Sequence, residues 1–144
     1  LIPRVMCLVW AIWSSATAYA YRWTTPDTLN SVEDILHFPI WIAWAVVSGG
    51  LVVGALIPPR MPRPVLYAGS TLRLVGMSLV GGLVTAWAFE FILDDSARGW
   101  VSGKNYLLLA FCAVITAGTV AQNRLDMLLP TALPEHIEPG VTYE

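Results

Sequence analysis

Residues 35–59 read ILHFPIWIAWAVVSGGLVVGALIPP, and no side chain in this stretch is formally charged when His37 is neutral. A helix needs about 20 apolar residues to cross the roughly 30 Å hydrocarbon core of a bilayer, and this stretch meets that length. Proline cannot continue a helix, so Pro58 and Pro59 should follow its end. The stretch therefore predicts a membrane-spanning helix over 36–57.

The rest of the chain has the same character. Hydrophobic residues make up 56% of the 144 residues and charged residues only 12%, about half the charge of an ordinary soluble domain. Further charge-poor runs predict helices over the ranges 5–23, 70–93 and 105–124. We expect an all-α, integral membrane four-helix bundle over 1–124, with up-down topology and short loops, followed by a polar tail over 125–144.

The connection after the second predicted helix is rich in proline. Pro58, Pro59, Pro62 and Pro64 alternate with Arg60, Met61 and Arg63. Each proline removes a backbone donor and restricts the residue before it, so we expect a short, stiff, non-helical turn over 58–64. Such a turn makes the helices over 36–57 and 70–93 an antiparallel hairpin.

Arginine and lysine set the expected orientation, because cytoplasmic loops are enriched in both. The up-down arrangement puts five basic residues on one side and three on the other: Arg4, Arg60, Arg63, Arg73 and Arg124 against Arg22, Arg98 and Lys104. This bias favours an orientation with both termini in the cytoplasm. A competing interpretation takes the first apolar run as a signal peptide cleaved after Ala18-Tyr19-Ala20.

Small residues form stripes on three of the predicted helices. Lipid is as apolar as leucine, so helices in a bilayer associate through close backbone approach and hydrogen bonds, which small residues permit. The candidate packing residues are Gly50, Gly54, Ser78, Gly82, Ala86, Ala113, Ala117 and Ala121. We expect them to pack helices within the chain; a dedicated oligomer face is the alternative.

Three ionisable residues lie in or near the predicted spans. Glu90 is expected to reach the interface from the end of its helix, where Arg22 or Lys104 could pair with it, and a functional carboxylate facing a cavity is the alternative. Arg73 is expected to extend to the headgroups, with a lipid-phosphate contact as the alternative. His37 lies at the start of the second predicted span, before Pro39, and is expected to have a capping or interfacial role.

Other chemistry finds little support in the sequence. Two cysteines and two histidines are too few for the usual metal-ligand sets, so we expect no metal and no cofactor. No nucleophile elbow, zinc-protease or phosphate-loop motif is present, and the predicted loops between helices are short, so we expect no enzyme activity. The net charge of −2 offers no basic surface for nucleic acid.

The short chain, the helices rich in glycine and tryptophan, the tight turns and the polar tail together resemble small phage-encoded membrane proteins of the holin type. The tail departs from their common basic ending, since it carries Glu135, Glu138 and Glu144. The resemblance implies self-assembly in the bacterial cytoplasmic membrane followed by permeabilisation, with Gly50/Gly54 and Ser78/Gly82 as contact faces. Two other functions stay open: an accessory subunit or assembly factor of a larger membrane complex, and a small channel or transporter that uses Glu90. The expected partners are membrane lipids and either copies of this chain or other membrane subunits.

Overall fold

A computed structural model describes residues 2–23, 33–35, 37–94 and 98–128, and the following account concerns these residues. Four long helices are present: α1 (Ile2–Ala20), α3 (Ile40–Leu56), α4 (Arg63–Asp94) and α5 (Gly99–Leu128). The described part of the chain contains no strand, so the all-α prediction is confirmed. Each of the four predicted ranges overlaps one of these helices. Of the predicted tail, 125–128 continues α5 and 129–144 lies outside the described residues.

The proline-rich turn is shorter than predicted, because α4 already begins at Arg63 and includes Pro64. The Pro62 carbonyl accepts hydrogen bonds from the amides of Val65 (3.0 Å) and Leu66 (3.1 Å). Pro64 fits in this first turn, where its missing N–H would have no partner within the helix. The prediction of a non-helical turn over 58–64 is therefore wrong at its end.

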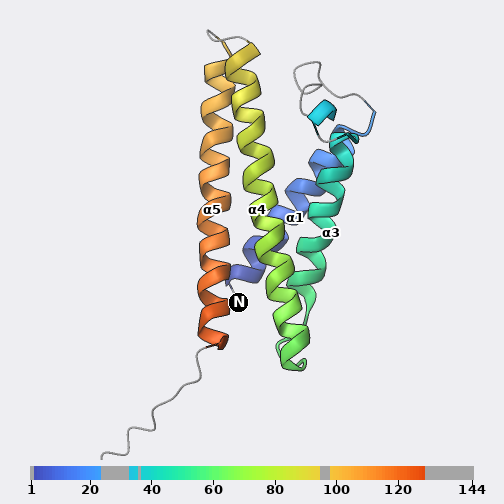
Figure 1. Cartoon of the computed structure of the whole chain (residues 1–144), viewed down its shortest axis with the longest axis vertical. Coiled ribbons are helices and arrows are strands. Elements are labelled where there is room, and N and C mark those ends of the chain that lie inside the picture. The colour runs from blue at the N-terminus through green and yellow to red at the C-terminus, as the bar shows by residue number, and fades with distance from the viewer. Residues whose placement is uncertain (1, 24–32, 36, 95–97, 129–144) are drawn as a thin grey trace, which may run out of the picture.

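The helices form two antiparallel pairs (Figure 1). The most extensive contacts join α4 to α5 and α1 to α3, and α3 packs on α4 to connect the pairs. Hydrogen bonds tie α1 to its neighbours: Trp10 Nε1 donates to Thr116 Oγ1 of α5 (3.3 Å), and Ser48 Oγ of α3 donates to the Ala11 carbonyl (2.9 Å).

The two pairs meet most closely where the end of α3 crosses the beginning of α4. A Cβ atom on Gly54 would lie 2.8 Å from the Gly69 carbonyl oxygen and 2.9 Å from Cγ of Arg73. One turn earlier on α3, Leu51 packs on Gly76, where an added Cβ would be 2.7 Å from Leu51 Cδ2. Glycine on both helices thus allows backbone contact at this crossing.

Aromatic rings fill the space where the four helices come together. Trp87 of α4 contacts Trp44 of α3, Tyr106 of α5 and Tyr21 just after α1, with ring centroids 5.1–5.6 Å apart. Trp13 extends this cluster by an edge-to-face contact with Trp44 at 5.2 Å. The interior is therefore packed with side chains contributed by all four helices.

Two helices are long and apolar enough to cross a membrane, α4 and the part of α5 from Gly99 to Leu125. Only 39% and 22% of their most apolar windows are buried within the chain. A core helix of a soluble protein would bury its apolar side chains, so these two helices leave an unusual amount of apolar surface uncovered. Helix α3 is also apolar but shorter, at 17 residues.

Candidate functional site

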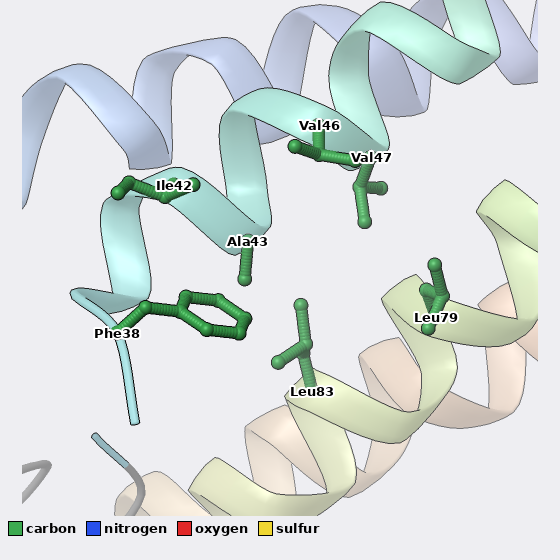
Figure 2. Close-up of a pocket in the computed structure, with 7 residues that line it drawn as sticks. All are labelled: Phe38, Ile42, Ala43, Val46, Val47, Leu79 and Leu83. Carbon is green, nitrogen blue, oxygen red and sulfur yellow. The ribbon is translucent and has the colours of Figure 1, made fainter. Parts of the chain in front are cut away.

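An apolar groove opens where α3 and α4 diverge from their crossing. Figure 2 shows side chains of both helices facing this space, which has a volume of about 370 Å³. Its lining is entirely hydrophobic: Phe38, Ile42, Ala43, Val46, Val47, Leu79 and Leu83. A second hollow of about 440 Å³ shares Leu79 and Leu83 and continues along α4. Its other lining residues are Ile35, Ser78, Gly82, Ala86, Phe89 and Glu90. We call the two hollows together the α3–α4 groove.

The start of α3 is held over the groove by a local cap. The side chain of Glu33 accepts a hydrogen bond from the first helical amide, Ile40 N, at 2.8 Å, and its carbonyl accepts one from His37 N at 2.8 Å. His37 has a positive φ of 59°, which turns the chain so that Phe38 lines the groove. The side chain that caps α3 is thus Glu33, while the predicted candidate His37 lies exposed beside it.

The predicted small-residue stripe of α4 lines this groove. Ser78 and Gly82 are exposed and Ala86 is half-buried. A Cβ on Gly82 would meet no heavy atom within 4 Å among the described residues, and the Ser78 hydroxyl bonds only back to the Leu74 carbonyl (3.0 Å). The expected packing within the chain is therefore not seen at Ser78 and Gly82, because α3 diverges before it reaches them.

The small-residue stripes of α5 and α3 differ in how many of their residues pack against another helix of the chain. On α5, Ala113 is fully buried beside Gly81, where an added Cβ on Gly81 would lie 3.9 Å from the Ala113 Cβ. Ala117 packs against the core, and Ala121 is half-buried. The predicted pair on α3 is split: Gly54 forms the crossing, whereas Gly50 has no atom within 4 Å of an added Cβ in the described structure. Packing within the chain thus accounts for Ala113 and Gly54.

Glu90 lies at the end of the groove near the end of α4 and is half-buried. Within the residues that the structure describes, no ion pair includes it. Its surroundings are a hollow open to the outside rather than an enclosed cavity, and the neighbouring lining residues Ala86 and Phe89 are apolar. A carboxylate placed beside apolar surface in this way can contribute specificity for a partner that carries a positive charge.

Arg73 is buried at the crossing of α3 and α4, and not at the membrane interface that the sequence predicted. Its side chain is only 3% exposed, and its guanidinium donates a hydrogen bond to the Gly54 carbonyl at 2.7 Å. That carbonyl is one of the last four of α3, which lack partners within the helix and carry the negative end of its dipole. Arg73 therefore caps α3 at the crossing, so the expectation that it extends to the headgroups or contacts a lipid phosphate is wrong.

Several residues that shape these features were missed by the sequence analysis. Gly69 and Gly76 flank Arg73 at helical spacing, and this face packs against α3. Gly69 was missed because the helix was predicted to start only at residue 70, whereas Gly76 lay within the predicted range 70–93 but its contact with α3 was not predicted. The sequence does not indicate that Phe38, Leu79 and Leu83 line a groove, because hydropathy does not distinguish one apolar residue of a predicted span from another.

Among the described residues, no group of three histidine, cysteine, aspartate or glutamate side chains could hold a metal ion. Comparison of the chain with protein-family models, with curated proteins and with solved structures found no match. The groove is therefore interpreted from its own chemistry: it is elongated, apolar and bordered by small residues, with one carboxylate at its end.

Proposed function

We propose that the chain is a four-span integral membrane protein that assembles laterally in a bacterial cytoplasmic membrane and permeabilises it, in the manner of holin-type proteins. The observation that carries this proposal is the α3–α4 groove, whose shape and small-residue border suit a transmembrane helix. In the proposed orientation both termini are cytoplasmic, and the turn with Arg60 is on the same side.

The exposed apolar surface supports a lipid environment. Large hydrophobic side chains project outward from every long helix, including Ile12 of α1, Val53 of α3, Leu79 of α4 and Phe111 of α5. At 1.5 Å per residue, the 19 residues of α1 and the 17 of α3 extend about 28 Å and about 25 Å. These lengths are close to the hydrocarbon thickness, and a short span is accommodated by local thinning.

Assembly, rather than a pore within one chain, is the favoured route to permeability. Aromatic side chains of α1, α3, α4 and α5 pack against one another between the helices. The groove instead opens outward, so a helix from another chain can reach it. The channel alternative, in which Glu90 faces a cavity of one chain, finds less support because Glu90 borders this outward-facing groove.

Filling the groove should abolish the activity. Gly82→Leu adds a branched side chain at the middle of the α4 stripe, where the described structure leaves space for it, so the chain itself should fold normally. We expect induction of the original chain in bacteria to collapse the membrane potential, measured with a voltage-sensitive dye, and the Gly82→Leu variant to leave it intact at equal membrane levels.

Gly49→Leu is the matched control. Gly49 is also helical and open, but it is not among the residues that line the groove. This variant should depolarise cells like the original chain. If the original chain at high expression leaves the potential unchanged, permeabilisation is excluded. Stoichiometric co-purification of a different membrane protein in mild detergent would instead support the accessory-subunit alternative.

Lipid exposure itself is testable with the two cysteines. Cys7 is buried and Cys112 is exposed on the middle of α5. In vesicles, Cys112 should resist a water-soluble maleimide because acyl chains cover it, whereas a cysteine introduced in the exposed turn by Met61→Cys should be labelled. Rapid labelling of Cys112 in intact vesicles would contradict the four-span arrangement.

A further inference from the structure

We propose that the groove receives α5 of a second copy of this chain, with Lys104 of the incoming helix placed against Glu90. The inference rests on the proposed self-assembly and adds to it the identity of the two contacting faces. Repeated from copy to copy, the contact joins the groove of each chain to α5 of the next.

The face of α5 opposite its packing side has the pattern of a docking helix. Lys104, Leu108, Phe111, Ile115 and Gly118 follow one another at intervals of four and three residues, which places them on one seam of the helix. Lys104 and Gly118 are exposed, and Leu108, Phe111 and Ile115 are 62%, 61% and 48% exposed. This outer face of α5 therefore has no cover within the described chain.

The uncovered face of α4 repeats the same spacing. Val75, Leu79, Gly82, Ala86 and Phe89 again follow at intervals of four and three. Four of these residues line the groove, and Val75 continues the row as an exposed side chain below it. Two helices with matching seams of this period can pack along their length at a shallow crossing angle.

The contact between α4 and α5 within one chain establishes which residues share a level. Gly81 lies beside Ala113, and Gly103 lies beside Ala88 and Ile92. The two helices are antiparallel, so moving toward the end of α4 from Gly81 corresponds to moving toward the start of α5 from Ala113. This count puts Lys104 at the same height along the helices as Glu90, and Leu108 at the same height as Ala86. The same count puts Phe111 within one residue of the level of Gly82, and Ile115 level with Leu79. These levels also apply between two copies that lie at the same depth in a membrane.

Size and charge are complementary in that alignment. Two large exposed side chains of the α5 seam, Leu108 and Phe111, meet the two smallest positions of the α4 seam, Ala86 and Gly82, while Ile115 meets Leu79. In the reverse sense, Gly118 comes within one residue of the level of the exposed Val75. Lys104 meets Glu90, and within the described residues no ion pair includes either side chain. Small-against-large pairs allow close packing, and the charge pair fixes the register.

The geometry allows the contact to repeat. The groove and the outer face of α5 are different surfaces of one chain, so a copy can receive one neighbour and insert into another. Such a head-to-tail contact closes into a ring or grows as an open array, depending on the angle between copies. Either outcome produces the large membrane assemblies that the proposed function requires.

Disulfide trapping tests the register directly. The full chain with Cys112→Ala would carry Ala86→Cys and Leu108→Cys together and be oxidised in bacterial membranes. We expect a ladder of cross-linked dimers, trimers and larger species, and no ladder from either single variant. The control pair, Ala86→Cys with Ile115→Cys, uses the same faces but is displaced by seven residues, about 10 Å, beyond the reach of a disulfide. A ladder from the control pair equal to that from the matched pair would overturn the proposed register.

Charge exchange tests the ion pair without relying on cysteine. Glu90→Lys and Lys104→Glu should each weaken association in lipid vesicles about tenfold, and the double exchange should restore most of it. Rescue by the double variant would attribute the loss in the single variants to the charge pair, because a general effect of either substitution on folding would persist in the double variant. Single variants that associate as tightly as the original chain would refute the pairing.

The two proposals fail in different ways. Energy transfer between labelled copies in vesicles measures self-association regardless of the faces used. If copies associate but the matched cysteines form no ladder, this contact is wrong and the proposed self-assembly stands. If copies do not associate at all, both proposals fail together.

Discussion

Replacing Gly54 by leucine is expected to separate α3 from α4 and to lower the free energy of unfolding by about 3 kcal/mol or more. Even a Cβ atom at this position would lie 2.8 Å from a backbone oxygen of Gly69, which cannot move without shifting α4. The larger side chain would also displace Arg73 and leave the Gly54 carbonyl without its guanidinium partner. Unfolding in mixed detergent micelles containing increasing SDS, followed by tryptophan fluorescence, measures the loss.

Gly50→Leu is the control for this experiment. Gly50 occupies the other position of the same four-residue glycine spacing, but an added Cβ there meets no described atom within 4 Å. The midpoint of unfolding in SDS should stay close to that of the original chain. Equal destabilisation by both substitutions would mean that helix composition, and not the contact between α3 and α4, determines the effect.

The second large effect is expected at the aromatic cluster. Trp87 is 2% exposed and contacts rings on three other segments of the chain, Tyr21, Trp44 and Tyr106. Trp87→Ala removes these contacts and leaves a cavity where the helices meet. We expect a loss of about 2–4 kcal/mol. This is at or below the range for buried tryptophan in soluble proteins, because in the proposed membrane arrangement lipid would compete for apolar side chains as water does not.

Trp100→Ala provides the comparison for Trp87. Trp100 is on α5, is more than half exposed and makes none of the ring contacts found for Trp87. Its removal should change the unfolding midpoint little. The same SDS titration applies to both variants, and a Trp87 variant as stable as the Trp100 variant would show that the cluster does not hold the two helix pairs together.

The number and approximate position of the helices were predictable from hydropathy alone. Charge-poor runs in the sequence correspond to α1, α3, α4 and α5, because a long apolar run satisfies its backbone most simply as a helix. The boundaries were less predictable. Pro64 suggested a turn, yet the first turn of a helix accepts proline, and this shifted the start of α4 by seven residues from 70 to Arg63.

The candidate site was only partly predictable. The stripe of Ser78, Gly82 and Ala86 was visible as small residues at helical spacing, but its spacing is the same as that of Ala113 and Ala117, which pack inside the chain. Arg73 likewise has the sequence context of a residue that reaches the surface. Its burial follows from the close approach of Gly54 to Gly69, which brings a free carbonyl of the distant residue Gly54 to the guanidinium.

The sequence by itself determined that this chain is helical, apolar and nearly free of charge in its long segments. Only the tertiary structure decided which face of each helix is covered. The physical reason is that α3, α4 and α5 carry apolar residues on all sides, so hydropathy does not distinguish a face that packs on a neighbour from one that remains open. That choice depends on where backbones approach closely, at Gly54 with Gly69, and on where the helices diverge, which leaves Gly82 uncovered.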